Sequence, residues 1–425
     1  MSLNRRSFLS LTAVAVSLSA AAACSGGSSD STGSDSASAA GSGDALVRDP
    51  DADLVIWADE KKANSLREAA TKWGEAQGIT VAVQVVANET QSTFVTANQA
   101  GNGPDVVLGA HDWIGNLVQN SSISPVQLTE AAKSNIAEVA LNAVTYDGQT
   151  YAVPYAVETL ALFVNKGLTS VTAPTTIEEL VAAGQAAGTE AVLSLPVDES
   201  GDAYHMQPLY TSGGGYLFGK NADGSLNPKD LGVGAEGSLA AAAKIGELGS
   251  QGVLKTSITG ANAISLFTDG KAPYLVSGPW ALADVVKAGI DYEVVQIPGF
   301  EGMSEARPFA GVNAFYVASK GKNAAFAQTF VTDVVKDTTI TAAMFELNQL
   351  PPVQKDLTEQ LKSTNPDMVT FTTLASEHAD PMPSIPEMAE VWSPLGKAEA
   401  NIVAGADPAT TMTSAGDEIR SAIKG

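Results

Sequence analysis

The chain has 425 residues, and its 47 acidic residues against 24 lysines and arginines give a formal net charge of −23. A surface with this charge repels nucleic acid and anionic lipid headgroups, so neither is expected as a binding partner. The length exceeds what one hydrophobic core supports, which predicts two domains or lobes. The single cysteine, Cys24, excludes a disulfide within one chain.

The first 23 residues have the pattern of an export signal. Arg5 and Arg6 precede an apolar run that ends in three alanines before Cys24. The run is short and interrupted by serines, so it is not expected to span a membrane. Residues 5–9 look like a twin-arginine signal, with the general secretory route as the alternative. The setting of Cys24 resembles a lipobox, which predicts lipid attachment; an inert buried thiol is the other interpretation.

Residues 24–48 consist mainly of Ser, Gly, Ala and Asp. Such a segment buries too little apolar surface to offset its ordering entropy, so it is expected to be a flexible linker. With the signal removed and Cys24 lipidated, the protein would be anchored to the outer face of the cell membrane. Its only expected membrane contact is the lipid.

From residue 54 onward, strand and helix patterns alternate. Apolar or alternating runs predict strands at 54–57, 79–86 and 106–108, and helical spacing predicts helices over 66–76 and around 94–97. This order favours an α/β fold with a parallel sheet covered by helices. Trp57 and Trp73 lie within these apolar patterns and are expected in the core.

The stretch 101–115 contains the first candidate site. A Gly- and Pro-containing turn leads into the buried strand at 106–108, which is followed by Ala-His-Asp-Trp. In open α/β sheets, ligands bind at the carboxyl ends of the strands. Asp112 offers two acceptor oxygens and Trp113 an apolar ring, which together suit a sugar. Alternatively, Asp112 caps a helix beginning near Ile114.

The remaining elements are predicted from turns, caps and apolar runs. Asp147-Gly148 predicts a hairpin, and Thr176 with Glu179 forms a capping box at the start of a helix over 177–188. Ser277-Gly278-Pro279 ends a strand and places Trp280 at a helix N-terminus. Further strands are expected at 193–196, 274–277 and 315–318, and further helices at 323–335 and near 419. Residues 309–312 are expected to form a second crossing between the lobes.

Five motifs in order resemble the maltose/maltodextrin-binding proteins of ABC importers, members of extracellular solute-binding protein family 1. They are the Gly-Pro-Asp to Ala-His-Asp stretch at 103–112, the segment 154–166, Asp202-Ala203-Tyr204, Gly278-Pro279-Trp280, and 381–388 with Trp392. The resemblance covers about residues 54 to 423. It implies a type II periplasmic-binding-protein fold: two α/β lobes, each a mixed sheet flanked by helices, joined by three crossings at the hinge. Lobe 1 would comprise 49–157 and 313–362, and lobe 2 would comprise 158–312 and 363–425.

The resemblance also implies a set of sugar-binding residues: Glu60, Lys61, Asp112, Glu158, Asp202, Tyr204, Trp280 and Trp392. Glu60 and Lys61 could instead be an exposed charge pair, and Glu158 a structural carboxylate at the hinge. Trp113 is added to the set because it stands where the family has an arginine, while Gly109 stands where the family has a stacking tryptophan. Either Trp113 supplies the missing ring or this part of the site is wider.

No catalytic motif, phosphate loop or metal-binding signature is present, and the three histidines are scattered. We therefore expect a binding protein that is not an enzyme and needs no cofactor or metal. The expected function is that of a monomeric solute-binding lipoprotein that delivers an oligosaccharide, maltose or maltodextrin, to the permease subunits of an ABC importer. A secreted glycosidase and a sugar-sensing receptor subunit are the alternatives.

Overall fold

The computed structural model describes residues 47–424. The predicted signal peptide, Cys24 and most of the predicted linker lie outside these residues. Two residues assigned to the linker, Val47 and Arg48, belong to the folded part. Arg48 is 4 % exposed and forms an ion pair with Asp105, which is fully buried. Within the described residues, no helix is both long and apolar enough to cross a membrane.

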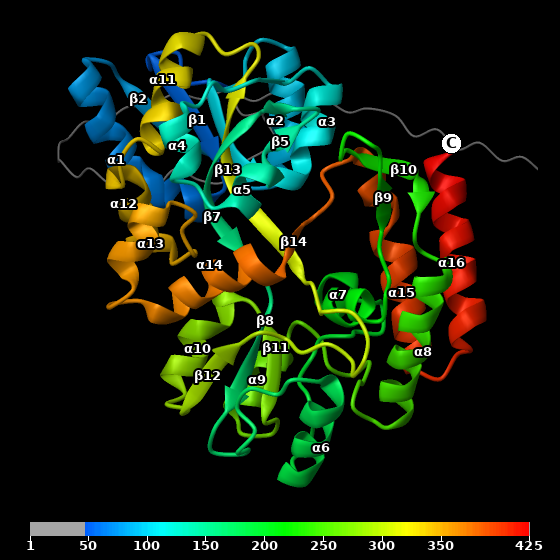
Figure 1. The fold of residues 1–425 in the computed structure, drawn as a ribbon. Helices are drawn as coiled ribbons and strands as arrows, with labels where there is room; N and C mark the ends of the chain where they lie inside the picture. The colour runs from blue at the N-terminus through cyan, green and yellow to red at the C-terminus, as the bar shows by residue number, and fades with distance from the viewer. Residues whose placement is uncertain (1–46, 425) are drawn as a thin grey trace, which may run out of the picture. The chain divides into compact units, whose positions relative to one another are not determined.

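The first lobe is built on a seven-stranded sheet with the order β14-β13-β3-β1-β2, in which β4 and β7 also pair with β13 (Figure 1). β1 runs parallel to β2 and β3, as predicted, whereas β13 runs antiparallel to β3 and β7. The strands are β1 (Leu54–Ala58), β2 (Val81–Val85), β3 (Val106–Ala110), β4 (Ile123–Ser124), β7 (Ala152–Glu158), β13 (Phe309–Ala318) and β14 (Asp380–Pro381).

Helices and a small hairpin surround this sheet. The helices are α1 (Glu60–Gln77), α2 (Thr90–Gln99), η1 (His111–Trp113), α3 (Ile114–Gln119), α4 (Glu130–Ser134), α5 (Glu138–Ala143), α11 (Ala324–Val334), α12 (Thr339–Asn348), α13 (Lys355–Leu361) and α14 (Pro366–His378). The hairpin pairs β5 (Thr145–Tyr146) with β6 (Gln149–Thr150). Its turn residues, Asp147 and Gly148, have φ angles of 47° and 73°, as a two-residue hairpin turn requires.

Asp105 determines where β3 begins. One carboxylate oxygen accepts the Val55 N–H at 2.8 Å and binds Arg48, and the other accepts the Asn323 N–H at 2.9 Å. The Gly-Pro-Asp turn is thereby joined to β1 and to the segment before α11. Because this start is fixed, the five residues of β3 deliver His111, Asp112 and Trp113 to the carboxyl end of the sheet.

The second lobe has a three-stranded sheet, β11-β8-β12, in which both neighbours run antiparallel to β8. Ser194 adds a parallel bridge to β11 through Leu275. A full strand was predicted at 193–196, but only this bridge forms; Pro196 has no N–H to continue a ladder. The strands are β8 (Ala161–Asn165), β9 (Phe218–Lys220), β10 (Leu226–Leu231), β11 (Tyr274–Ser277) and β12 (Tyr292–Val295).

The helices of this lobe pack on the sheet and on one another. Helices α8, α15 and α16 lie side by side (Figure 1). The helices are α6 (Ile177–Ala187), α7 (Ala203–Ser212), α8 (Glu236–Ser250), α9 (Ala263–Thr268), η2 (Pro279–Ala281), α10 (Leu282–Lys287), η3 (Pro386–Glu390), α15 (Trp392–Val403) and α16 (Pro408–Ile423). The predicted cap of α6 is present, since the Thr176 hydroxyl accepts the Glu179 N–H at 3.1 Å.

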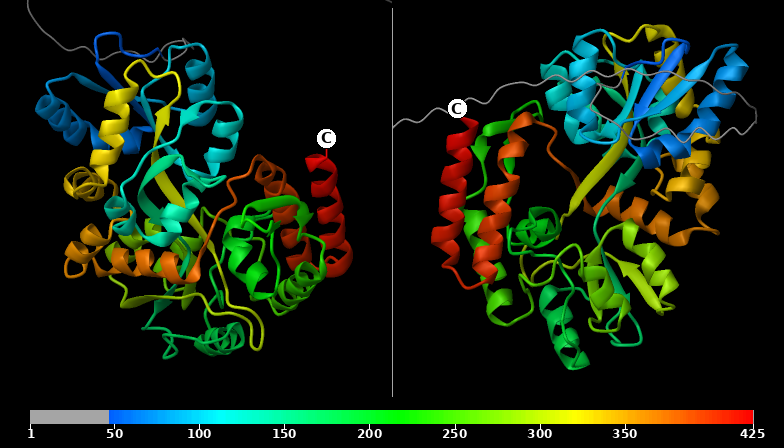
Figure 2. Two further views of the ribbon diagram at one scale, coloured as in Figure 1. Left: turned by 45° about the horizontal axis from the view of Figure 1, so that its top comes forward. Right: turned by 180° about the vertical axis from the view of Figure 1, so that it is seen from behind.

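Three segments connect the two lobes: β7 into β8, β13, and the stretch from α14 through β14 to η3. The expected crossing at 309–312 and the expected strand at 315–318 together form one continuous strand of ten residues, β13 (Figure 2). It pairs with β3, β7 and β14, so all three connections meet along it. The third connection is also attached to α3, where the Gly115 N–H donates to the Ser384 carbonyl at 2.9 Å.

The core residues divide into three clusters. One contains the first sheet, one contains α7, α8, α15 and α16 with one face of the β8-β11-β12 sheet, and one contains the other face of that sheet. Phe345 of α12 and Phe371 of α14 join the third cluster, whereas Met344 and Ala375 of the same helices join the first. These helices therefore contribute to the cores of both lobes, and the predicted lobe boundary at 362 stays a prediction.

Candidate functional site

The ring of Trp113 lies against the backbone of Gly109. A Cβ atom added to Gly109 would be 2.1 Å from a carbon of this ring, so the ring occupies the space of a side chain at position 109. Trp113 is the last residue of η1, directly beyond β3, and is half-buried. Of the two possibilities raised by the sequence, this geometry favours Trp113 as the replacement for the missing ring.

Trp280 is placed in the same way at the end of β11 in the second lobe. A Cβ atom on Gly278 would be 2.1 Å from a carbon of the Trp280 ring. Trp280 is nevertheless 43 % exposed, which is unusual for a large apolar side chain. Glycine next to the indole allows the ring to rest on the strand end while part of it faces outward.

A row of aromatic rings continues from Trp280. Tyr204 of α7 has its ring centroid 6.5 Å from that of Trp280 and stacks on Phe309 at 6.0 Å. Phe309 meets Trp392 of α15 edge to face at 5.6 Å. The row therefore unites three predicted site residues from separate elements. Sequence analysis missed Phe309, which was assigned only to a crossing segment.

Asp112 does not cap a helix. Its Oδ1 is buried and has no hydrogen-bond partner within the described residues, and no side chain caps η1 or α3. Burial raises the pKa of the Asp112 carboxyl above its usual value, against the opposing effect of His111. An unpaired buried acceptor is costly, so this oxygen is suited to accept a hydrogen bond from a bound hydroxyl group.

The neighbouring His111 has a structural role that sequence analysis missed. The ring is fully buried, and burial lowers the pKa of His111. Its Nδ1 accepts the Val312 N–H at 3.0 Å, so Nε2 donates to the Met382 carbonyl at 2.9 Å. One neutral imidazole thus joins the end of β3 to β13 and to the segment after β14.

Glu158 ends β7 and faces β13. The Asn313 side-chain amide donates to its Oε2 at 3.0 Å. Burial raises the pKa of Glu158, and the Asn313 hydrogen bond and the charges of Lys62 and Lys61 oppose this shift. The predicted Lys61 is therefore close enough to act on Glu158, although its side chain is exposed.

Two acids stand at the start of α1, Asp59 and the predicted Glu60. Asp59 is the one that is held by hydrogen bonding and an ion pair. Asp59 accepts the Lys62 N–H at 3.0 Å and forms an ion pair with the Lys62 ammonium group. Glu60 is the first residue of the helix and is exposed. The capping preference of aspartate before a helical pattern was the sequence signal for this position. A sugar-binding role for Glu60 stays a prediction.

Asp202 is the N-cap of α7. Its Oδ1 accepts the His205 N–H at 3.0 Å, and its Oδ2 lies 2.7 Å from His205 Nδ1. Both carboxylate oxygens are therefore engaged with one histidine. Direct contact between Asp202 and a sugar, as predicted, is not tested by this geometry.

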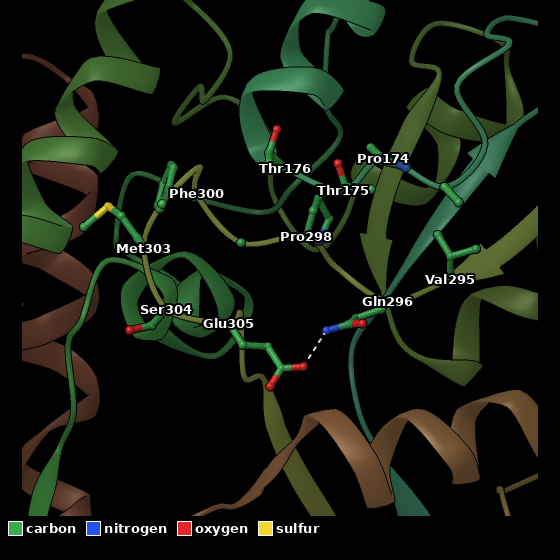
Figure 3. A pocket seen from close by; sticks show the side chains of 13 residues that line it. Pro174, Thr175, Thr176, Val295, Gln296, Pro298, Phe300, Met303, Ser304 and Glu305 are labelled. Carbon is green, nitrogen blue, oxygen red and sulfur yellow. Dashed lines mark hydrogen bonds between the residues drawn. The ribbon is translucent and has the colours of Figure 1, made fainter.

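Two hollows of the described structure do not coincide with the predicted site. A cleft of about 1610 Å³ is bordered by Tyr146, Tyr216, Arg307 and Phe309, among others, but by none of the nine predicted residues. Phe309 alone connects it to the aromatic row. A pocket of about 500 Å³ lies between residues 173–176 and 295–305, where Gln296 donates to Glu305 at 2.7 Å (Figure 3).

Within residues 47–424, no group of three or more His, Cys, Asp or Glu side chains could hold a metal ion. The site instead combines aromatic rings with acceptor-rich carboxylates drawn from both lobes. This combination of candidate residues, on a scaffold of two α/β lobes joined by three connections, is typical of a solute-binding protein.

Comparison with known proteins leads to the same class. The family described as bacterial extracellular solute-binding protein matches residues 68–370. A galactooligosaccharide-binding protein of Bacillus subtilis is 30 % identical over 387 residues, covering 88 % of this chain and 90 % of the relative. A maltodextrin-binding protein of the same organism is 28 % identical, covering 86 % and 88 %. The crystal structure of a cyclo/maltodextrin-binding protein complexed with maltotetraose has a TM-score of 0.78 and 28 % identity, and the match covers 87 % of this chain and 97 % of that chain.

The chain belongs to the bacterial extracellular solute-binding protein family. The resemblance to maltodextrin-binding proteins and the two-lobe α/β fold are both confirmed. These relatives are binding proteins rather than enzymes, so the interpretation as a non-enzymatic binding protein is confirmed as well.

Proposed function

We propose that this protein is the sugar-binding lipoprotein of an ABC importer and that it binds an oligosaccharide between its two lobes. Its ligand is a maltodextrin, an α-linked chain of glucose units. The lipid on Cys24 holds it at the outer face of the cell membrane, where it delivers the sugar to the permease subunits.

The observation that carries the proposal is the pair of tryptophan–glycine contacts. Trp113 rests on Gly109 in one lobe and Trp280 rests on Gly278 in the other. Aromatic rings present an apolar surface on which the C–H face of a sugar can pack. The unpaired Oδ1 of Asp112 and the carboxylate of Glu158 are the acceptors for the sugar's hydroxyl groups.

Binding would be coupled to closure of the lobes. A sugar held by Asp112 and Trp113 gains the contacts of Trp280, Tyr204 and Trp392 only when the lobes approach each other. The ligand shifts the equilibrium toward the closed form by the difference between its affinities for the two forms. The permease then recognises the closed form.

A galactooligosaccharide is the second candidate ligand, because one relative with 30 % identity is named for it. Stacking on tryptophan suits either sugar, so the aromatic row does not separate them. The difference between glucose and galactose is the orientation of one hydroxyl group. Discrimination must therefore come from the hydrogen-bonding groups around the rings.

The proposal is tested by thermal-shift measurements on the mature protein with maltotriose, maltotetraose, galactooligosaccharides and control sugars. A ligand that binds the native state stabilises it by mass action and so raises the melting temperature. At a ligand concentration of 100 times the dissociation constant, the free energy of unfolding increases by about 2.7 kcal/mol. We expect the largest shift with a maltodextrin and expect the sugar to be recovered intact by chromatography. A shift with none of the oligosaccharides would refute sugar binding, and shortened sugar would favour a glycosidase.

A further inference from the structure

His205 occupies a position next to the exposed tryptophan of the second lobe. It is the third residue of α7, and its ring meets the Trp280 ring at 88°, with 6.3 Å between the ring centroids. Its side chain is largely enclosed but keeps 15 % of its surface exposed. The imidazole thus stands at a right angle to the indole on which a sugar unit would pack and is its immediate neighbour.

The protonation pattern of His205 follows from its partner. Asp202 accepts hydrogen bonds from both the backbone N–H and Nδ1 of His205, at 3.0 Å and 2.7 Å. Because the carboxylate is an acceptor, Nδ1 is the nitrogen that bears the proton. In the neutral imidazole, Nε2 then has a free lone pair. Nε2 has no hydrogen-bond partner in the part of the chain that the structure describes.

Asp202 is in turn held by its place in the helix. It is the N-cap of α7, and the first turn of that helix contains Tyr204, which stacks on Phe309. Turning Asp202 toward a ligand would break the cap and release the histidine. The arrangement therefore favours indirect action of Asp202: it orients the imidazole, and the imidazole meets the ligand.

We propose that His205 is a specificity-determining residue whose Nε2 accepts a hydrogen bond from a ring hydroxyl of the sugar unit stacked on Trp280, with Asp202 as its positioning residue. This inference rests on the proposed oligosaccharide-binding function. The hydroxyl groups of a pyranose project from the edge of its ring, so a unit stacked on Trp280 would present hydroxyl groups to the side chains beside the indole, of which His205 is one. An acceptor beside the indole selects a ligand with a donor there and disfavours one whose oxygen is methylated or absent.

Three substitutions of His205 separate the contributions of its two nitrogens. His205→Gln places an amide near the position of Nε2, whereas His205→Asn keeps a polar atom only near Nδ1, within reach of Asp202. His205→Phe keeps the ring and its contact with Trp280 but loses both nitrogens. With maltotriose as the probe, we expect His205→Phe and His205→Asn to weaken binding about 10- to 100-fold, and His205→Gln to recover most of the affinity.

Monodeoxy maltotrioses identify the hydroxyl group. We expect one deoxy analogue to bind the wild-type protein about 10- to 100-fold more weakly than maltotriose does. The same analogue and maltotriose should bind the His205→Phe variant equally well. This pair of results would show that His205 interacts with the hydroxyl group that the analogue lacks. Asp202→Ser preserves an N-cap residue and should weaken maltotriose binding when it is the only substitution. Added to His205→Phe, it should cause no further loss of affinity. Melting temperatures without sugar should stay within a few degrees for all the variants.

Two results would overturn the inference while leaving the proposed function intact. One is wild-type affinity of His205→Phe for maltotriose. The other is equal loss of binding in all three histidine variants together with a large drop in melting temperature, which would assign His205 a structural role only. Failure of the proposed function is recognised separately, because wild type itself would then bind no oligosaccharide.

Discussion

At the scale of single residues, the positions of two site tryptophans, Trp113 and Trp280, depend on a glycine. Gly109 and Gly278 leave open the volume that the rings of Trp113 and Trp280 fill, and a side chain at either glycine would collide with a ring. In the sequence, Gly109 looked like the loss of a stacking residue. In the structure, it is the residue that lets Trp113 approach the strand end.

The exposed ring of Trp280 leads to a prediction about affinity. Because 43 % of this side chain is exposed without ligand, Trp280→Ala should hardly change the sugar-free melting temperature. It should weaken oligosaccharide binding by about 2–4 kcal/mol, the range for a buried interface anchor. Isothermal titration calorimetry and a melting curve measure the two effects.

Trp73 provides the matched control. Its ring packs edge to face on Phe330 at 5.0 Å, and its Nε1 donates to Asp333 at 3.0 Å. It is half-buried and packs against the core in which it was expected, so Trp73→Ala should lose stability near the lower end of about 3–5 kcal/mol. Its affinity should be unchanged. Normal binding with a much lower melting temperature for Trp280→Ala would instead place Trp280 in the core.

At the scale of elements, the packing of α7 against α15 encloses a carboxyl group with no partner. Glu399 of α15 is fully buried, and neither of its oxygens has a hydrogen-bond partner within residues 47–424. Burial raises the pKa of Glu399 well above its usual value, and the charge of Asp202 adds to this shift. Gln207 Oε1 of α7 is also buried and unpaired. A protonated Glu399 removes the cost of a buried charge between these helices.

This raised pKa predicts how stability depends on pH. The folded state binds a proton at Glu399 that the unfolded state releases near pH 4.3, so the free energy of unfolding falls as the pH rises through the interval between the two pKa values. The slope from one such group is at most about 1.4 kcal/mol per pH unit. Glu399→Gln should flatten this dependence and be more stable than wild type at pH 8. Urea unfolding at pH 5, 6, 7 and 8 measures both slopes.

Asp112 and Glu158 also have raised pKa values. The free energy of unfolding of the Glu399→Gln variant should therefore still depend on pH, although less steeply than that of the wild type. The informative quantity is therefore the difference between the two proteins. If the free energies of unfolding of the two proteins change in parallel across the four pH values, Glu399 is ionised in the folded state at neutral pH.

At the scale of the whole molecule, the proposed attachment to the membrane would depend on one residue outside the described part. Cys24 is the only cysteine, and the net charge of −23 repels anionic lipid surfaces, so no other feature of the chain is expected to hold it there. We predict that wild type incorporates labelled fatty acid and sediments with membranes, whereas Cys24→Ala incorporates none. Ser28→Ala, in the same linker, should behave like wild type. Equal labelling of all three proteins would contradict lipid attachment at Cys24.

The sequence by itself determined the features that depend on neighbouring residues. Helical spacing, the Thr176 cap and the Asp-Gly hairpin involve contacts within a few positions, and these elements formed where they were predicted. The family motifs likewise identified the protein class, because each is a short continuous stretch. The alternative interpretation of Asp112 as a helix cap is the exception: its signal was local, but the structure leaves Oδ1 of this carboxylate without a partner among the described residues.

Only the tertiary structure decided how those stretches meet. His111 binds the carbonyl of Met382, 271 positions away, and Phe309 lies between Tyr204 and Trp392. The strand predicted at 193–196 is only a bridge between Ser194 and Leu275, because Pro196 has no N–H to extend the ladder. Pairings of this kind depend on which distant residues become neighbours once the chain is compact, and no local pattern encodes them. For the same reason, the Trp113–Gly109 contact and the place of His205 beside Trp280 became visible only in the folded protein.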